Sequence, residues 1–461
     1  MENMKQPNIF TNINIALAIA LLYNITGLIS ATVLSQNSIV VVSAFIPEGI
    51  ALASALIYGY RVLPGIFLGQ LLLAQFEWSN SSASMLIATV NTLEAYIGYK
   101  LFYKFELNRE LKHLKDLIGL VILSILILQP IAAILNNYAL YLAHVINSDM
   151  IWNHTILWWT GNIMGQILIT PMLLLVYANK HTLRYKYIIL AILAPLAYNY
   201  LIQRYFDITN VSLLLLLTLP IGIYVAIKDI TYATIVATSL SIGYTYLTHL
   251  DIGTFAQDQS PIDNIINLNY FILSHVLLTL LIGILFKDKE HAINELKSMA
   301  HYDYLTGLPN RHLLREKIQH AVIMASDYHQ KSAICYIDLD GFKDVNDIYG
   351  HHIGDETLQS VVQRVKLHMK SQDTLLRIGG DEFLLIISEI SDNDELDKIL
   401  NNLLKDVRKP MKIDNKTIDI SFSIGVAICP THGVTVKELM SQADSAMYKA
   451  KEEGKNRIIY A

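Results

Sequence analysis

The sequence predicts two parts of different class, a polytopic α-helical membrane domain followed by a soluble α/β domain. Hydrophobic residues make up 53% of the 461-residue chain and charged residues only 16%, but the charge is unevenly spread. Residues 1–286 contain 12 Lys and Arg and 13 Asp and Glu, whereas residues 287–461 contain 23 and 27. The low proportion of charged residues in the first part is typical of a membrane protein, and the higher proportion in the second part is typical of a soluble domain. We expect a multi-span membrane domain over 1–286, a connector helix over 287–302 and a soluble domain over 303–461. Neither part is basic, so no nucleic acid partner is expected.

Ten apolar stretches predict eight to ten helices that cross a lipid bilayer. Several are close to the roughly 20 residues that such a helix needs. They lie near residues 15–34, 39–59, 62–76, 83–103, 117–144, 154–177, 187–203, 211–227, 231–249 and 267–286. The second and third are separated only by Tyr60 and Arg61, so they predict either two crossings or a re-entrant pair. We interpret the first stretch as an anchor, because no small-residue cleavage site stands out after it.

The basic residues predict how this domain is oriented. Lys and Arg cluster in the connections near 100–115 and 180–186 and directly after the last apolar stretch. The connections between the other ends of the helices are poor in them. Because basic loops stay on the cytoplasmic side, ten crossings would put both chain termini in the cytoplasm.

Two carboxylates lie inside the apolar stretches, where a charge is costly and often functional. They are Glu48 and Glu94. A ligand pocket and a pair of protonated or hydrogen-bonded structural residues explain them equally well. For Trp158 and Trp159, near a stretch boundary, we favour interfacial anchors over ligand contacts.

Alternating patterns over residues 303–461 predict an α/β domain around a central, mostly antiparallel sheet flanked by helices. The helical patterns cover residues 313–328, 355–370, 396–407 and 436–451. The strand patterns cover residues 333–339, 418–428, 457–460 and a hairpin over 374–387.

Gly379 and Gly380 lie between the two apolar runs of the hairpin and predict a tight turn. Asp381 and Glu382 follow at once. Glycine lets a backbone approach a phosphate closely, and paired carboxylates can hold a hard divalent cation. An ordinary acidic hairpin would have the same pattern, so the surrounding sequence must decide.

Asp338 lies at the end of the apolar run 333–337. If the hairpin pairs with this strand, Asp338 and Asp381 come together and, with triphosphate oxygens, suit Mg²⁺. Lys343, in the turn that follows, is a plausible phosphate contact.

Asn346 and Asp355 could together pair with the donor and acceptor edge of guanine. The alternative for Asp355 is a charge that stabilises a helix N-terminus. The alternative for His351 is a buried, hydrogen-bonded side chain.

Several runs in the first part resemble the membrane-associated sensor domains of the MASE type found in bacteria. They are residues 47–53, 61–69, 91–95 and 158–162. The resemblance covers about residues 10–285. It implies a multi-pass sensor in the bacterial inner (cytoplasmic) membrane, with no general ligand.

Five blocks in the second part resemble the GGDEF domain of diguanylate cyclases over residues 303–461. They are residues 303–311, 338–347, 350–355, 379–383 and 443–456. The resemblance implies a nucleotidyl-cyclase-like fold and a homodimer in which each protomer binds one GTP. The 3′-hydroxyl of each GTP would attack the α-phosphorus of the other, which gives cyclic di-GMP and two pyrophosphates.

The same resemblance implies roles for individual residues. It assigns Mg²⁺ or Mn²⁺ to Asp338, the backbone carbonyl of Leu339, Asp381 and Glu382. It assigns GTP to Phe342, Lys343, Asn346, His351, Asp355, Gly379, Gly380, Lys451 and Lys455. The expected catalytic residues are Asp381, Glu382 and Lys343. Glu382 is either the general base or a ligand of a second metal.

Many members of this family also carry an Arg-x-x-Asp site that binds product and inhibits the enzyme. Here Lys370 and Asp373 occupy those positions. Lysine cannot form the forked hydrogen bonds of arginine, so inhibitory binding of cyclic di-GMP is doubtful. In the connector, an apolar stripe at Ala292, Leu296 and Met299 predicts either a short coiled coil between protomers or a helix that packs on its own domain.

The sequence favours a membrane-anchored diguanylate cyclase regulated by its sensor domain. A catalytically silent GTP-binding scaffold would be expected to lack Asp338, Asp381, Glu382 or Lys451, and all four are present. A transporter with an attached regulator would be favoured by an internal inverted repeat, and none is evident.

Overall fold

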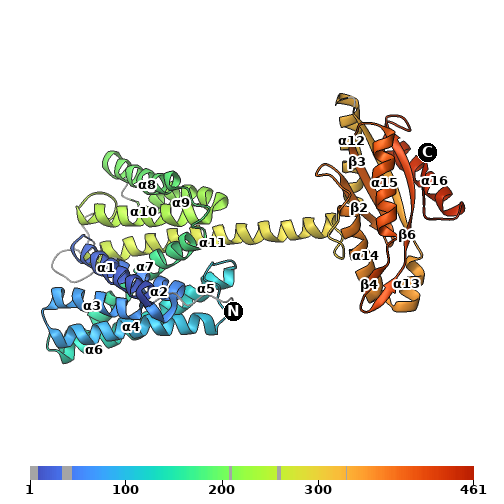
Figure 1. Ribbon diagram of the computed structural model, residues 1–461. Helices are drawn as coiled ribbons and strands as arrows, with labels where there is room; N and C mark the ends of the chain where they lie inside the picture. The colour runs from blue at the N-terminus through green and yellow to red at the C-terminus, as the bar shows by residue number, and fades with distance from the viewer. Residues whose placement is uncertain (1–8, 34–43, 207–209, 257–260, 329) are drawn as a thin grey trace. The chain divides into compact units, whose positions relative to one another are not determined.

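The computed structural model describes residues 9–33, 44–206, 210–256, 261–328 and 330–461. The chain forms two compact units, Met1–His291 and Ala292–Ala461 (Figure 1). The boundary lies inside one long helix, α11 (Pro261–His301), which contains both the last predicted span and nearly all of the predicted connector.

The described part of the first unit is mainly helical. Nine of the ten predicted stretches each overlap one α-helix, and the stretch 117–144 covers two; residue 34 of the first stretch and residues 39–43 of the second lie outside the described residues. Besides α11, the helices are α1 (Ile9–Val33), α2 (Ile46–Tyr58), α3 (Leu63–Trp78), α4 (Ser81–Lys104), α5 (Leu114–Ile122), α6 (Gln129–Leu142), α7 (Ile151–Ala178), α8 (Tyr185–Tyr205), α9 (Val211–Lys228) and α10 (Ile230–His249). Within the described residues, seven helical stretches are long and apolar enough to cross a membrane. The expected eight to ten crossings stay a prediction, as does the choice between crossing and re-entrant helices for α2 and α3.

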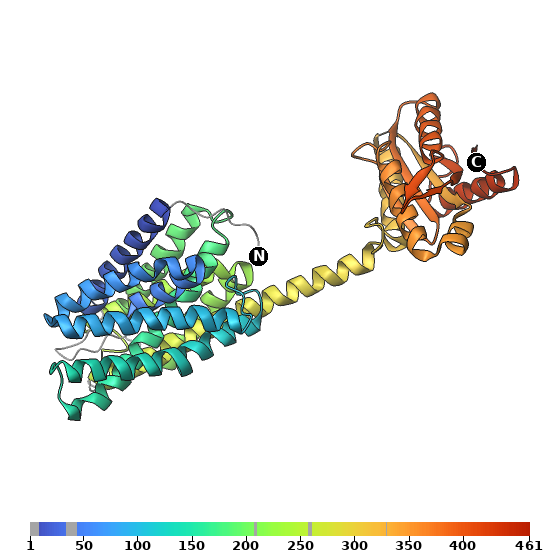
Figure 2. The same ribbon diagram turned by 60° about the horizontal axis from the view of Figure 1, so that its bottom comes forward.

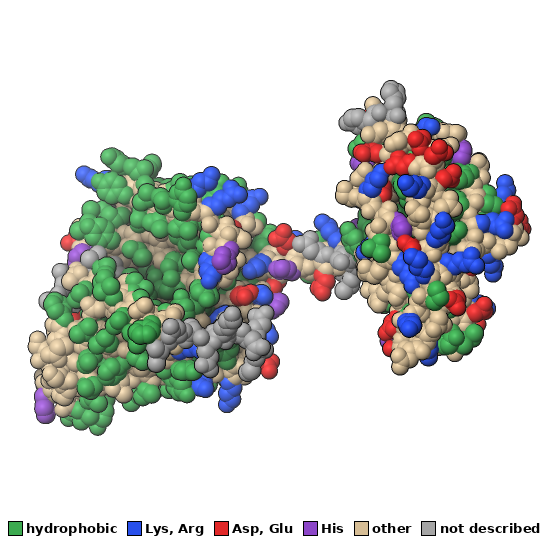
Figure 3. Space-filling model, in the orientation of Figure 1, with side chains coloured by type: hydrophobic (Ala, Val, Ile, Leu, Met, Phe, Trp, Pro, Cys, Tyr) green, Lys and Arg blue, Asp and Glu red, His purple; other side chains and the backbone are tan. Residues whose placement is uncertain are grey.

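The outer surface of the first unit is hydrophobic. Hydrophobic side chains cover much of its visible face in Figure 3, and Leu72, Leu126 and Leu216 are more than half exposed. Soluble proteins rarely expose large contiguous apolar patches, because water disfavours them. A surface of this kind fits a unit surrounded by lipid.

Basic residues from separate loops meet at one end of this unit. The Arg109 guanidinium and the Lys180 ammonium lie 5.8 Å and 4.5 Å from the centre of the Tyr177 ring. In the same loop as Arg109, His113 lies 3.2 Å from Asp288, just after the last predicted span. The contacts bring together three of the basic segments that the sequence assigns to the cytoplasmic side.

The second unit is built on a five-stranded sheet with the order β2-β3-β1-β6-β7. The strands are β1 (Lys331–Asp340), β2 (Thr374–Gly379), β3 (Glu382–Ile390), β6 (Ser421–Cys429) and β7 (Arg457–Tyr460). Only the β6–β7 pair is parallel, so the predicted mostly antiparallel sheet is confirmed. A small hairpin, β4 (Met411–Ile413) with β5 (Lys416–Ile418), was not predicted.

Helices cover both faces of this sheet (Figures 1 and 2). They are α12 (Arg311–Tyr328), α13 (Phe342–Tyr349), α14 (His351–Lys366), α15 (Asn393–Val407) and α16 (Val436–Glu452). Alternate β1 side chains enter two cores: Cys335 and Ile337 pack with α14 and α15, whereas Ile334 and Tyr336 pack with α12 and α16. This explains why β1 is apolar from Ala333 to Ile337, because a strand covered on both faces needs no polar side.

Candidate active site

The Gly-Gly turn lies beside the end of the central strand. Asp338 on β1 is the direct pairing partner of Glu382 on β3. The backbone N–H of Leu339 donates to the carbonyl oxygen of Asp381 over 3.2 Å. Antiparallel pairing of β1 with the hairpin thus brings Asp338, Asp381 and Glu382 to the same end of the paired strands.

Asp338 is buried and lies near both a positive and a negative side chain. Its side chain is only 9% exposed, and Nζ of Lys451, from α16, lies 2.7 Å from its Oδ2. Burial raises the pKa of Asp338, the hydrogen bond from Lys451 lowers it, and the charge of Asp381 raises it again, so that the net shift is upward. One lysine therefore compensates the carboxylates only in part. A divalent cation with oxygen ligands fits this donor set, since it would stabilise both carboxylates in their charged form.

Asp340, two residues further along β1, is already hydrogen-bonded within the domain. Its carboxylate accepts hydrogen bonds of 2.7 Å from the hydroxyls of Ser421 and Ser423 and one of 3.1 Å from the backbone N–H of Asn456. Asp340 therefore ties β1 to β6 and to the segment after α16 that carries Lys455. Strand alternation puts both aspartates on one face, but only the partner strand distinguishes their roles.

Arg377 holds the Gly-Gly turn in shape. Its Nε and Nη2 donate to the carbonyl of Gly380 over 3.0 Å and 2.7 Å, and its Nη1 lies 2.9 Å from Oδ1 of Asp303. Gly380 has a φ of 47°, a conformation that glycine adopts without strain.

Asp303 is the charged partner that holds the Arg377 side chain in place. Burial would raise its pKa, but hydrogen bonds from Thr306 and Arg377 outweigh burial and lower it. Asp303 lies in the block 303–311 and Arg377 in the predicted hairpin 374–387, but no role was predicted for either. A signal was present, namely an arginine two residues before a Gly-Gly turn and an aspartate elsewhere to pair with it.

A single tight turn separates the helices that carry Asn346 and Asp355. Gly350, with a φ of 84°, separates α13, which carries Asn346, from α14, which carries Asp355. A Cβ at Gly354 would lie 2.0 Å from Oδ1 of Asn346, so only glycine leaves room for that amide against α14.

A pocket of about 350 Å³ adjoins this arrangement and contains both Asp355 and the Gly-Gly turn. Its lining residues are Asp303, Tyr304, Leu305, Asn310, Arg311, His312, Asp355, Arg377, Ile378, Gly379 and Gly380. Of the other expected nucleotide contacts, Lys343, His351 and Lys455 are exposed, whereas Phe342 is buried. The segment before α12 contributes to this pocket, although the sequence analysis assigned it no contact.

Lys370 and Asp373 already have interaction partners within the second unit. Nζ of Lys370 lies 2.7 Å from Oε1 of Glu395. The two oxygens of Asp373 accept from the backbone N–H groups of Lys370 and Ser388 over 2.7 Å and 3.0 Å. Any ligand that binds here must displace or bypass these contacts.

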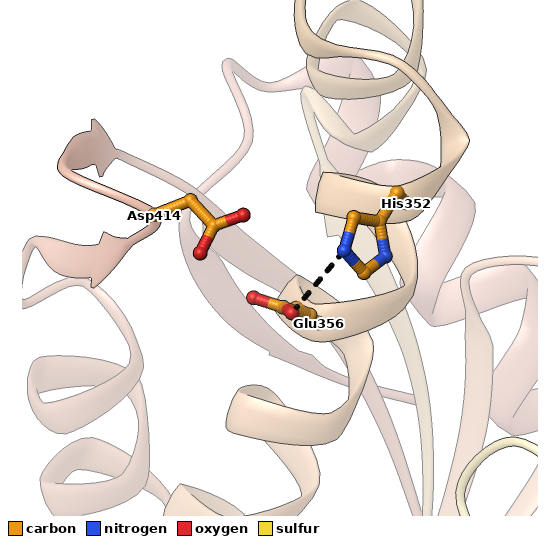
Figure 4. Close-up of side chains that lie close together, drawn as sticks. All are labelled: His352, Glu356 and Asp414. Carbon is orange, nitrogen blue, oxygen red and sulfur yellow. Dashed lines mark ion pairs between the residues drawn. The ribbon is translucent and has the colours of Figure 1, made fainter.

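A second group of potential metal ligands lies on the surface near α14 (Figure 4). His352 and Glu356 are one helical turn apart, with Nε2 and Oε1 separated by 3.6 Å, and Asp414 approaches from the turn between β4 and β5. Their ligand atoms lie within 4.8 Å of one another, but His352 and Asp414 are exposed. An exposed cluster alone does not define a site, and the sequence analysis did not single it out.

Comparisons with known proteins agree with both resemblances. Residues 14–290 match the MASE1 family, and residues 300–457 match the family described as "Diguanylate cyclase, GGDEF domain". The bifunctional diguanylate cyclase/cyclic di-GMP phosphodiesterase MucR of Pseudomonas aeruginosa is 43% identical over 165 residues, 36% of this chain and 24% of MucR. The diguanylate cyclase TpbB of the same species (strain UCBPP-PA14) is 34% identical over 161 residues, 35% of this chain and 37% of TpbB.

A solved structure of the TpbB GGDEF domain shares 32% identity with this chain. It aligns with a TM-score of 0.34 and covers 35% of this chain and 94% of that one. The chain spans about a quarter of the length of MucR and somewhat over a third of that of TpbB. The matches confirm the predicted MASE-type region and GGDEF domain. The chain belongs to the MASE1 family and carries a GGDEF domain after its MASE1 region.

Proposed function

We propose that this protein is a membrane-bound diguanylate cyclase that condenses two GTP into cyclic di-GMP and two pyrophosphates. The observation that carries the proposal is the meeting of Asp338, Asp381 and Glu382 beside the Gly-Gly turn, with Lys451 paired to Asp338. The name of a relative that shares the domain, TpbB, supports the same activity. The intact carboxylate set argues against a silent GTP-binding scaffold.

The proposed roles are those that the resemblance to the GGDEF family implies, and the shared pocket of Asp355 and the Gly-Gly turn supports them. Asn346 and Asp355 hold the guanine, and Gly379 and Gly380 let the backbone approach the phosphates. The nearby cations are assigned to the phosphates; they are Lys343, Lys451 and Lys455. Lys455 lies where members of the GGDEF family often have arginine; it keeps the positive charge but cannot bind a phosphate in the bidentate way that arginine does.

Asp338, the Leu339 carbonyl and Asp381 would hold Mg²⁺ or Mn²⁺. The bound cation would neutralise phosphate charge and lower the pKa of the attacking 3′-hydroxyl. Glu382 either accepts the proton of that hydroxyl or holds a second cation. In each half-reaction a new bond joins the 3′-oxygen to the α-phosphorus, and pyrophosphate leaves.

The product contains two such bonds, whereas one turn of this kind serves one GTP. We therefore propose a homodimer in which two GGDEF domains face each other. The first unit, in the bacterial inner membrane with both termini cytoplasmic, would regulate that approach.

The proposed division into residues 1–286, 287–302 and 303–461 makes the connector the link between the two domains. In support, α11 continues without a break from the last predicted span to His301. The side chains of Leu296 and Met299 lie outside what the structure describes, so the coiled coil stays a prediction.

Purified full chain should convert GTP and Mg²⁺ to cyclic di-GMP, identified by chromatography and mass spectrometry. A scaffold would bind GTP and leave it intact. GTP binding by a folded dimer without product would therefore support the scaffold and reject the enzyme.

Gly354→Ala should raise the KM for GTP about tenfold and lower kcat less, because the added methyl group displaces the Asn346 amide. Steady-state kinetics would measure this. Elsewhere in a helix, alanine is more favourable than glycine by roughly 0.5–1 kcal/mol, so the fold should persist. An unchanged KM in the folded variant would count against Asn346 as a guanine contact.

Lys370→Arg should lower the concentration of cyclic di-GMP that halves the activity by about tenfold, because arginine can fork onto the product. Adding Glu395→Ala should strengthen the effect, since Glu395 is the present partner of Lys370. Lys366→Arg, an exposed substitution at the end of α14, is the matched control. Equal inhibition of all these variants would show that this position does not govern product binding.

A further inference from the structure

The two carboxylates inside the first unit differ in how well they are paired. Oε1 of Glu48 accepts hydrogen bonds from the Tyr23 hydroxyl over 3.0 Å and from the Asn91 amide over 2.8 Å. These bonds join α1, α2 and α4. Glu48 therefore fits the alternative of a hydrogen-bonded structural residue better than that of a ligand contact.

Glu94 is only partly satisfied. It is 5% exposed, and its Oε1 accepts 2.7 Å hydrogen bonds from the amides of Gln129 and Gln166. Its Oε2 has no partner among the described residues, and neither do the side-chain oxygens of Gln129 and Gln166. A buried acceptor without a donor costs about 1–3 kcal/mol. Within the described part of the chain, three buried oxygens are thus left without a donor, one on Glu94 and one on each of the two glutamines beside it. A hydrogen-bond donor at this place would stabilise them.

The backbone between α5 and α6 explains how Gln129 comes to lie beside Glu94. Residues Leu123–Leu128 form a π-helical turn, and the N–H of Gln129 donates to the carbonyl of Ser124, one residue further back than in an α-helix. Pro130 follows and has no N–H to give. The Ile125 carbonyl instead accepts from the Trp159 indole over 3.2 Å. π-Turns inside helices are costly and occur often at functional sites.

A pocket of about 110 Å³ opens at this place between α4 and the π-turn with α6. Glu94 lines it together with eight apolar residues: Val90, Leu93, Ile97, Ile127, Leu128, Ile131, Ala132 and Leu135. Leu93, Ile131 and Leu135 are each about half exposed on the outer, apolar surface of the unit. The pocket is therefore an apolar groove that opens toward lipid and has one carboxylate among its walls.

We propose that this groove binds a lipid-soluble molecule with an apolar chain and a head that donates hydrogen bonds, such as a hydroxyl or an ammonium group. The chain would lie along the leucines and isoleucines, and the head would donate to Oε2 of Glu94. A molecule with only acceptors is disfavoured because it would bring lone pairs against lone pairs. A small hydrated ion is disfavoured because the groove offers it no polar path.

Three probes of equal chain length test the proposal on the full chain in phosphatidylcholine nanodiscs. They are 1-hexylamine, 1-hexanol and 2-hexanone, of which only the ketone lacks a donor. At ten times the half-saturating concentration, the amine and the alcohol should raise the apparent Tm of the first unit by about 2–4 °C. The ketone should leave the Tm unchanged.

Glu94→Gln should reverse this selectivity. Its side-chain oxygen can keep both glutamine bonds, while an N–H₂ group replaces the free acceptor. The ketone should then stabilise the protein, and the amine should lose its effect. Glu77→Gln, which neutralises an exposed carboxylate of α3, should keep the wild-type pattern.

A second pair of variants tests the groove if Glu94→Gln does not fold. Leu135→Trp should block the groove and abolish all probe effects. Leu142→Trp, on the same helix but outside the groove, should not. Equal shifts from all three probes in the wild type would mean that they only partition into the bilayer. That result, or an unchanged pattern in both Glu94→Gln and Leu135→Trp, would overturn the proposal.

Discussion

Replacing Asp381 with Asn should reduce the synthesis of cyclic di-GMP by about two to three orders of magnitude. Asn has nearly the same shape, but it removes one of the two carboxylates that would hold the cation next to the phosphates. Loss of a directly acting electrostatic group in a shielded site commonly costs about 3–4 kcal/mol of transition-state stabilisation. Initial rates of product formation at saturating GTP would measure the loss.

The fold should survive this change. The contact that Asp381 makes with β1 uses its backbone carbonyl, which Asn retains. Asp344→Asn is a matched control, since Asp344 is exposed in the first turn of α13 and has no assigned role. If Asp381→Asn kept more than a tenth of the wild-type rate, Asp381 would not be an essential metal ligand.

Gly425→Ala should unfold or severely weaken the second unit. Gly425 lies on β6 under α16, and a Cβ there would lie 2.1 Å from both the Ala443 carbonyl oxygen and the Met447 nitrogen. These are backbone atoms, so no side chain can move aside, and α16 must shift away from the sheet. Since overpacking alone costs roughly 1–3 kcal/mol, we expect a loss of about 3 kcal/mol or more.

Thermal unfolding should report a drop in the Tm of the second unit of about 6–12 °C. Any folded remainder should also lose activity, because α16 carries Lys451 to Asp338. Val426→Ala, one residue along and packed in the opposite core, should cost only about 2 kcal/mol. Equal effects of the two substitutions would mean that the close approach of α16 to β6 has no special importance.

Much of the second unit could be predicted from local sequence. Two glycines between apolar runs specify the hairpin, and the apolar run before Asp338 specifies a covered strand. The choice of Asp338 over Asp340 as the expected metal ligand rested on the family resemblance alone. Its physical cause lies in tertiary structure, because Ser421 and Ser423, on a strand about 80 residues away, donate hydrogen bonds to the Asp340 carboxylate. The bond between Arg377 and Asp303 likewise depends on tertiary structure.

In the first unit, long apolar stretches identified the helices, because hydrophobicity over such lengths is a strong signal. The π-turn was not predicted, since Leu123–Leu128 has the composition of any membrane helix and only Pro130 hints at an irregularity. Trp159 was expected to be an interfacial anchor, but its indole donates to the Ile125 carbonyl that this turn leaves available.

The most direct test of the proposed activity is the stoichiometry of the reaction. Purified full chain in nanodiscs, supplied with GTP and Mg²⁺, should release two pyrophosphates for each cyclic di-GMP and stop when the cation is chelated. A folded dimer that binds GTP but releases neither product would contradict the assignment of this protein as a diguanylate cyclase.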